Sequence, residues 1–255
     1  MVLTACDSHA EMVGRPILES TTARTGGDDP TVVAPDAVST PALGARAPLV
    51  VVTLFTDYQC PNCKRMHDLA ARLVDRWPDE VQVQFRQLPH SQHPLARVSA
   101  RAALAAHRLG RFACMHSALV RSRASWTGLA TDAFGDFARR ELGPRCGLDA
   151  ERFARDFDDG AIAARVQADW ELAGDLGVRG TPTALVDGLE VKLWPRAGVR
   201  PAMLLNAVVR RSLRDARAQR EACARDGREA CDGRALLEQR LFGNTGNQDA
   251  VKLLD

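Results

Sequence analysis

Residues 49–88 hold a strand, a helix and a second strand in close succession, and this unit constrains the fold more than any other part of the chain. The first segment, "LVVVTLF" from Leu49 to Phe55, is a short apolar run rich in β-branched residues, which predicts a buried parallel strand. From Pro61 to Trp77, apolar residues recur every three or four positions, as on one face of a helix, and Pro78 ends the pattern. Residues 81–88, "VQVQFRQL", alternate between apolar and polar and predict a second strand. Together these segments predict a βαβ unit.

The rest of the chain predicts a helical block, then a hairpin and a final helix. No convincing strand pattern occurs between residues 89 and 182. Ala-rich and amphipathic runs there predict helices over 95–110, 111–122, 132–142, 149–157 and 161–176, and Gly143-Pro144 is expected to end the third of them. Strands over 183–186 and 189–193 flank Asp187-Gly188, a typical hairpin turn, and a helix follows over about 200–218. The sequence therefore predicts an α/β fold with an inserted all-helical domain.

The balance of charge and hydropathy argues against two classes of partner. A net charge of +2 over 255 residues provides no basic field that would attract nucleic acid or an anionic membrane surface. No run reaches the roughly eighteen consecutive apolar residues that a membrane-spanning helix requires. We therefore expect no nucleic-acid partner, and contact with a membrane only through a lipid anchor.

The N-terminal segment, residues 1–47, contains a candidate lipidation signal followed by a tether. Leu3-Thr4-Ala5-Cys6 resembles a bacterial lipobox, in which small residues precede a cysteine that becomes lipidated. Only Met1 and Val2 precede this box, so a chance match of four residues is the alternative. The following residues are rich in Thr, Pro, Gly, Ala and Asp without a sustained period, as in a flexible linker. We expect lipidation at Cys6 and a lipoprotein linker that ends at Ala47.

Cys60 and Cys63 flank Pro61 and Asn62 at the junction of the first strand and its helix. Backbone N–H groups are unpaired at a helix N-terminus and the macrodipole is positive there, so this position stabilises an anion. Such a placement can lower the pKa of a cysteine from about 8.5 into roughly the 3.5–7.5 range. Cys63 lies one turn later, near enough to close a disulfide with Cys60 and to attack a mixed disulfide formed there. The spacing therefore predicts Cys60 as the nucleophile and Cys63 as the resolving thiol.

A metal site and a structural bridge are the alternatives for this cysteine pair. Structural zinc takes four ligands, often two cysteine pairs. The chain contains no second C-x-x-C; His67 could be a third ligand, but no fourth is evident. A bridge across so short a loop would constrain the unfolded chain little. We therefore favour a redox role over both.

The segment "FTDYQCPNCKRMHDLA" resembles the active-site region of DsbA-like thiol:disulfide oxidoreductases, thioredoxin-fold proteins of the bacterial envelope. The resemblance extends over about 48–213 and includes "LAGDLGVRGTPTALVDG", residues 172–188. It implies that Thr181-Pro182 is a cis peptide bond beside the active cysteines, with Pro182 belonging to the catalytic site. It also implies that the backbone of Thr181 pairs with an extended substrate, which Pro61 and Asn62 would contact as well.

The resemblance also implies how the chain is divided. Beyond the tether we expect a first thioredoxin-fold half over 48–93, a helical insertion over 94–176, a second half over 177–218 and a C-terminal extension over 219–255. Two positions depart from the family pattern. Leu54 stands where many relatives carry a buried acidic residue, and Asn62 stands where a histidine would help to hold the thiolate. Without the buried carboxylate, deprotonation of Cys63 is expected to need water or the substrate. Without the histidine, we expect a less extreme redox potential than that of the strongest oxidants.

Four further cysteines remain if Cys6 is lipidated and Cys60 and Cys63 are catalytic. They allow two structural bridges in three connectivities. We favour pairing Cys114 with Cys146 and Cys223 with Cys231; the alternative for Cys114 is a buried free thiol on an apolar helix face. Seven cysteines beside this motif indicate an oxidising compartment.

These observations predict a protein disulfide oxidoreductase of the periplasm or cell envelope. No organic cofactor or metal is implied, because the redox-active Cys60–Cys63 disulfide would carry the electrons. The expected partners are protein thiols and disulfides and a membrane redox-recycling partner. Two other classes remain open: a binding or chaperone module without turnover, and a zinc-bound structural domain.

Overall fold

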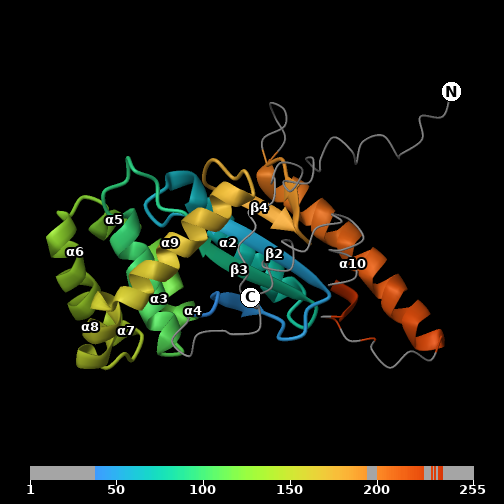
Figure 1. Ribbon diagram of the computed structural model, residues 1–255, viewed down its shortest axis with the longest axis horizontal. Helices are drawn as coiled ribbons and strands as arrows, with labels where there is room; N and C mark the ends of the chain where they lie inside the picture. Colours follow the sequence, from blue (N-terminus) through green and yellow to red (C-terminus); the bar gives the residue numbers. More distant parts are fainter. Residues whose placement is uncertain (1–37, 194–199, 227–230, 232, 234, 238–255) are drawn as a thin grey trace, which may run out of the picture.

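A five-stranded mixed sheet forms the centre of the molecule in a computed structural model, which describes residues 38–193, 200–226, 231, 233 and 235–237. The strand order is β1-β3-β2-β4-β5 (Figure 1). The strands are β1 Ala42–Gly44, β2 Val50–Thr56, β3 Val81–Gln87, β4 Thr183–Val186 and β5 Leu189–Val191. β2 pairs in parallel with β3, with Val50 opposite Val81, and antiparallel with β4, with Leu54 opposite Ala184. The predicted βαβ unit and hairpin therefore form one continuous sheet.

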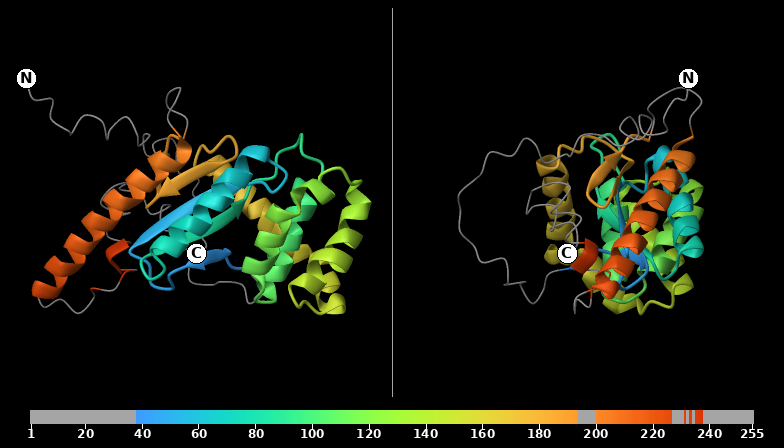
Figure 2. Two further views of the ribbon diagram at one scale, coloured as in Figure 1. Left: turned by 180° about the vertical axis from the view of Figure 1, so that it is seen from behind. Right: turned by 90° about the vertical axis from the view of Figure 1, so that its right-hand side faces the viewer.

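The two faces of β2 are both buried, which is why its sequence lacks an alternating pattern. Val50, Val52 and Leu54 belong to the main hydrophobic core, whereas Val51 and Phe55 belong to a second cluster. Helices α2, Pro61–Arg76, and α10, Pro201–Arg225, cover the first face, and α9, Gly160–Asp175, covers the second (Figure 2, right). The end of β2 is thus held between two packed layers.

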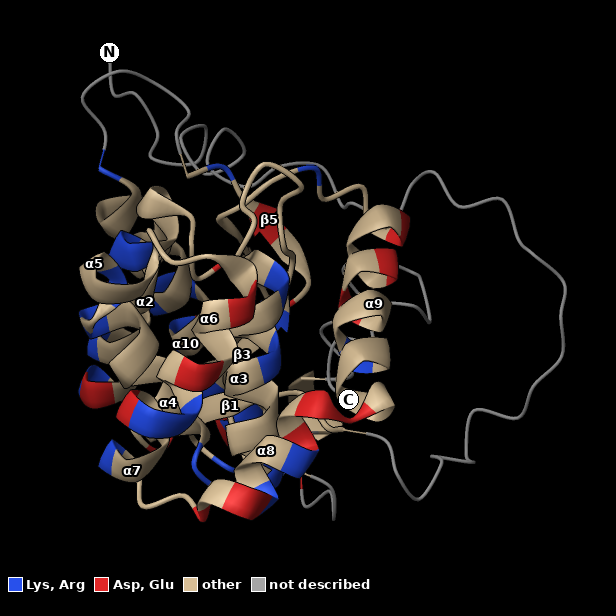
Figure 3. Cartoon of the chain, turned by 90° about the vertical axis from the view of Figure 1, so that its left-hand side faces the viewer, with Lys and Arg blue, Asp and Glu red and all other residues tan. Residues whose placement is uncertain are grey.

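The helical block lies at one end of the sheet, and acidic and basic residues are interspersed along its helices (Figures 1 and 3). Its core contains Trp126, Phe134 and Phe153, all fully buried. A disulfide joins Cys114 to Cys146 within the block, and a second joins Cys223 to Cys231. The helices of the block are α3 Ala96–Arg108, α4 Phe112–Arg121, α5 Arg123–Trp126, α6 Thr131–Phe137, the π-helix η2 Ala138–Leu142, α7 Gly143–Arg145 and α8 Ala150–Asp158.

Three sequence-based expectations about the elements need correction. The expected linker over 1–47 is too long, because residues 42–44 form β1, which pairs antiparallel with β3. The helix expected to end at Gly143-Pro144 continues through η2 to Arg145, since proline is tolerated in the first turn of a helix. The last helix extends to Arg225 rather than residue 218, because the sequence between Pro201 and Gly227 contains no glycine or proline.

Some expectations fall outside the part of the chain that the structure describes. These include the lipobox with Cys6, most of the N-terminal linker and most of the C-terminal extension. Among the helices that are described, none combines the length and apolar character needed to cross a bilayer.

Candidate active site

Cys60 occupies the N-cap position of α2, directly after the loop that leaves β2. Its backbone is extended, at φ −68° and ψ 123°, and Pro61 begins the first turn with the φ that a helix requires. No side chain caps this helix end, and its first turn contains no acidic residue. The amide groups of the first turn therefore remain available to the Cys60 sulfur.

The Cys60 thiol is acidified by its neighbours. A hydrogen bond from the Cys63 side chain is the largest cause; backbone N–H groups of Cys63 and Asn62 and the Thr181 side chain add to it and together lower the pKa of Cys60 to about 5. At neutral pH the sulfur is therefore the nucleophilic thiolate. The thiolate is also sheltered, because only 6% of Cys60 is exposed.

The pKa of Cys63 is shifted in the opposite direction to that of Cys60. It is fully buried, and burial together with the adjacent Cys60 sulfur raises the pKa of its thiol above the ordinary value. Both cysteines are free thiols in this structure, so it describes the reduced state of the pair. One thiolate and one protonated thiol in contact are the arrangement that dithiol–disulfide exchange needs.

The segment before β4 approaches the same sulfur from the other side. The Thr181–Pro182 peptide bond is cis, and the Thr181 carbonyl oxygen lies 3.7 Å from Cys60 Sγ. Thr181 also lines a cleft of about 530 Å³. Thr181 therefore connects this cleft to the Cys60 sulfur.

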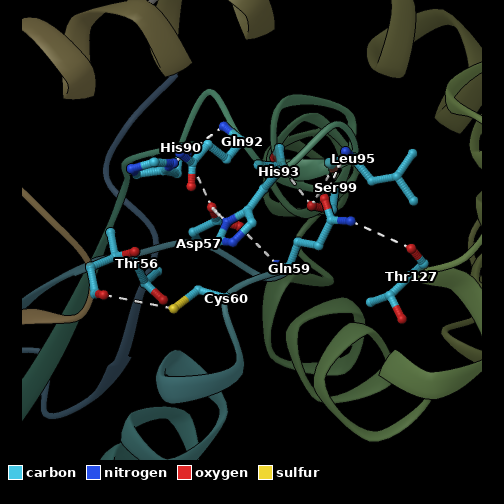
Figure 4. A network of polar contacts seen from close by, with 12 residues as sticks. Thr56, Asp57, Gln59, Cys60, His90, Gln92, His93, Leu95, Ser99 and Thr127 are labelled. Atoms are coloured by element: carbon cyan, nitrogen blue, oxygen red, sulfur yellow. Dashed lines mark hydrogen bonds and ion pairs between the residues drawn. The ribbon is translucent and has the colours of Figure 1, made fainter.

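A network of buried hydrogen bonds orders the loop that carries Cys60 (Figure 4). Asp57 accepts hydrogen bonds from the backbone N–H groups of Gln59 and His90, at 2.8 and 3.1 Å, and contacts His93 Nδ1 at 2.6 Å. Gln59 in turn accepts a 2.7 Å hydrogen bond from the backbone N–H of Leu95. These contacts join the active-site loop to the start of the helical block.

The sequence did not reveal this network. Neither Asp57 nor Gln59 was predicted to belong to the site. Their partners are more than thirty residues away and share no local pattern with them. The adjacency of an acidic residue to the cysteine motif was the single available signal.

A second buried cluster lies behind Cys63. His67, one turn further along α2, is 3% exposed, and its Nε2 lies 3.0 Å from Thr56 Oγ1. Its ring stacks on Tyr58 and meets His116 edge-on, with centroids 5.3 and 4.6 Å away. Burial lowers the pKa of both histidines, that of His116 to about 4, so both are neutral at neutral pH.

His67 was also considered as a third zinc ligand, but the structure gives it a different neighbour. Its Nε2 is engaged by Thr56 rather than directed to a metal site shared with the cysteines. Within the described residues, no group of three or more His, Cys, Asp or Glu side chains is arranged to hold a metal ion.

The residues between the two cysteines are accessible. Pro61 and Asn62 are exposed on the first turn of α2. Asn62 lines a smaller hollow of about 330 Å³ with Met66 and Pro201, between α2 and the start of α10. The substrate contacts expected for Pro61 and Asn62 stay a prediction.

A paired thiolate and thiol at a helix N-terminus, beside a cis-proline and on a thioredoxin fold, define the class of thioredoxin-like oxidoreductases. The match to the family described as Thioredoxin covers residues 36–197, and the chain belongs to this family. The expected resemblance and fold are thereby confirmed.

Several solved structures share the fold of this chain. A thioredoxin-like oxidoreductase from Silicibacter pomeroyi is 31% identical, with a TM-score of 0.52, over 69% of this chain and 92% of that one. The thiol-disulfide exchange protein α-DsbA2 from Wolbachia pipientis is 23% identical, with a TM-score of 0.53, over 67% and 86%. A periplasmic thioredoxin-like protein from Salmonella enterica is 23% identical, with a TM-score of 0.51, over 83% and 99%. The last two likenesses concern the fold alone.

Part of a longer protein is also similar in sequence to this chain. The Na⁺/H⁺ antiporter NhaA of Herminiimonas arsenicoxydans is 29% identical over 168 residues, which are 65% of this chain and 24% of that protein. The chain thus spans less than a quarter of the length of this relative.

Proposed function

We propose that this protein is a protein thiol:disulfide oxidoreductase that works through Cys60 and Cys63. The observation that carries the proposal is the unequal ionisation of two sulfurs in contact. Cys60, at the start of α2, has its pKa lowered to about 5, whereas burial raises the pKa of Cys63. An inert structural pair has no need of such an asymmetry, whereas an exchange reaction depends on it.

In the oxidising direction, a substrate thiolate attacks Cys60 Sγ of the Cys60–Cys63 disulfide. The bond between the two cysteines breaks, its electron pair leaves on Cys63 Sγ, and that sulfur takes up a proton. A second substrate thiolate then attacks the substrate sulfur of the mixed disulfide. The substrate leaves oxidised, and both active-site cysteines leave reduced.

In the reducing direction, the Cys60 thiolate attacks a substrate disulfide and releases one substrate thiolate. Cys63 then loses its proton and attacks Cys60 Sγ, which releases the second substrate thiolate and closes the Cys60–Cys63 bond. Two electrons pass to the substrate in this cycle. No organic cofactor or metal is needed for either direction.

The cleft beside Thr181 is proposed to receive the substrate chain in an extended form. Its wall includes the half-exposed Trp170 together with Arg97 and Arg179, and none of the described residues that line it is acidic. The Thr181 backbone would pair with the substrate, and Pro61 and Asn62 would contact it from the opposite side. This surface favours a segment that combines an apolar and an acidic side chain around its cysteine.

The proposed location is the periplasm or cell envelope, with Cys6 as the lipid anchor and a membrane redox partner that recycles the pair. Support comes from the two disulfides, which persist in oxidising compartments. The structurally similar thioredoxin-like protein from Salmonella enterica is periplasmic, which agrees with this location.

A Cys60→Ser variant tests the function directly. The purified protein is incubated with a reduced, unfolded test protein, and the return of that protein's disulfides is followed by mass spectrometry. Cys60→Ser should abolish the exchange, and a matched Cys6→Ser variant should retain it. Continued exchange in the Cys60→Ser variant would refute the proposal and favour a binding module without turnover. Equilibration with glutathione buffers then gives the potential, which separates an oxidase from a reductase.

A further inference from the structure

The resolving cysteine presents a chemical problem that the exchange reaction alone does not solve. Cys63 is fully buried and protonated, yet its sulfur has to become a thiolate before it can attack Cys60. Asp57 is the nearest carboxylate in sequence. Its oxygens already accept hydrogen bonds from Gln59 and His90 and contact His93. A different group has to receive the Cys63 proton.

Thr56 lies between Cys63 and a buried imidazole. The Thr56 side chain is in hydrogen-bonding contact with the Cys63 sulfur, and the Thr56 hydroxyl oxygen lies 3.0 Å from His67 Nε2. Thr56 is the last residue of β2, and Cys63 and His67 are one turn apart on α2, so one buried hydroxyl contacts both groups. A hydroxyl can accept one hydrogen bond and donate another, which suits the middle position.

His67 is neutral because burial lowers its pKa, so its imidazole can take up a proton only while the adjacent Cys63 thiolate balances the charge. Its Nδ1 is buried and has no hydrogen-bond partner in the described part of the chain, an arrangement that a purely structural role leaves unexplained. Its ring is held by Tyr58, Phe85 and His116. The ring orientation is therefore fixed with Nε2 toward Thr56.

We propose that Thr56 and His67 relay the proton of Cys63 during thiol–disulfide exchange. This inference rests on the proposed function. In the resolving step the Cys63 S–H proton passes to Thr56 Oγ1, and the Thr56 hydroxyl proton passes to His67 Nε2. Cys63 Sγ forms its bond to Cys60 Sγ, the bond from Cys60 to the substrate sulfur breaks, and the electron pair leaves with the substrate thiolate. In the opposite direction the same path returns a proton to Cys63.

The imidazolium that forms is short-lived. While Cys63 is a thiolate, the two charges offset each other inside the protein; once the disulfide closes, the buried cation has no counter-charge and releases its proton to solvent. The titratable groups that face His67 are Cys63 on the same helix, Tyr58 on the loop and His116 on α4. Burial raises the pKa of Tyr58 and lowers that of His116, so neither supplies a competing charge at neutral pH.

Ellman's reagent separates this step from the first attack. The full chain is used in a Cys6→Ser background with the active-site pair selectively reduced. Attack by Cys60 releases one coloured thiolate, and resolution by Cys63 releases a second. The variants are Thr56→Val, which removes the hydroxyl but keeps the shape, and His67→Phe, which keeps an aromatic ring without nitrogen. Thr56→Ser restores a hydroxyl, and Thr53→Val on the same strand is the matched control.

Thr56→Val and His67→Phe should slow the second release by about 10²-fold at neutral pH, within the range of general acid–base catalysis, and leave the first release intact. Their resolving rates should rise in proportion to hydroxide, whereas wild-type, Thr56→Ser and Thr53→Val rates stay nearly level over the neutral range. A second release within twofold of wild type in both variants, with an unchanged pH profile, overturns the relay. Absence of both releases in the wild type would instead refute the proposed function.

Discussion

Removing the side chain of Cys63 should make Cys60 a weaker acid. The hydrogen bond from the Cys63 side chain is the largest of the contributions that lower the pKa of Cys60 to about 5. A hydrogen bond to a charged group is worth about 1.5–3 kcal/mol, and one pKa unit corresponds to about 1.4 kcal/mol. Cys63→Ala should therefore raise the pKa of Cys60 by about one to two units, to about 6–7.

The fraction of Cys60 that is ionised changes most in mildly acidic solution. At pH 5.5 a thiol with a pKa of about 5 is roughly three-quarters ionised, whereas one with a pKa of about 6–7 is between about a quarter and a thirtieth ionised. Cys63→Ser is the matched control, because its hydroxyl can still donate to the Cys60 sulfur. We expect its midpoint to lie much nearer the wild-type value.

The assay is alkylation of reduced protein by iodoacetamide as a function of pH. Mass spectrometry follows the peptide that contains Cys60, so that reaction at Cys6 is not counted. The midpoint is compared rather than the limiting rate, because a thiolate of higher pKa is intrinsically more nucleophilic. A wild-type midpoint near 8.5, or the same midpoint in Cys63→Ala and wild type, would contradict the account of this site.

The same ionisation links the stability of the reduced protein to pH. The pKa of Cys60 is depressed in the folded state, so its contribution is complete above the ordinary thiol value of about 8.5 and is lost as the pH falls toward about 5. Urea unfolding of the reduced protein should show this loss over that window, and Cys60→Ser should not.

Three further predictions concern the rest of the molecule. Replacing both Cys114 and Cys146 by Ala opens a loop with a separation of 32 residues and should cost up to about 4 kcal/mol in urea unfolding; an unchanged midpoint would mean that the bridge does not form. Asp169→Ala removes the buried carboxylate that contacts Arg86 and Arg165 and should cost about 3–5 kcal/mol, so a loss below about 1 kcal/mol would contradict a stabilising role for these ion pairs. Arg97→Glu with Arg179→Glu should lower kcat/KM for an acidic cysteine peptide and raise it for a basic one; equal effects on both would exclude charge recognition in the cleft.

The elements with a strong local pattern could be predicted, and those without one could not. β2 and β3 follow from a β-branched run and an alternating run, and the hairpin follows from Asp187-Gly188. β1 was missed because three residues, Ala-Leu-Gly, are too few to show a period. The pairing with β3 that makes them a strand is a long-range contact.

The residues of the site also fall into those that a local sequence pattern predicts and those that it does not. Cys60 and Cys63 are visible in the sequence because their spacing and position before a helix carry the chemistry locally. The contact of Thr56 with His67 was not predicted, because it depends on how α2 packs on the end of β2.

The disulfide between Cys114 and Cys146 has a consequence for the maturation of each newly synthesised molecule. Under the proposed activity, a newly made copy arrives with both of these sulfurs reduced and has to lose two electrons before its helical block is closed. Its maturation then depends on the same kind of disulfide exchange that mature copies carry out. Each new copy is therefore first a substrate of the reaction that it will later catalyse.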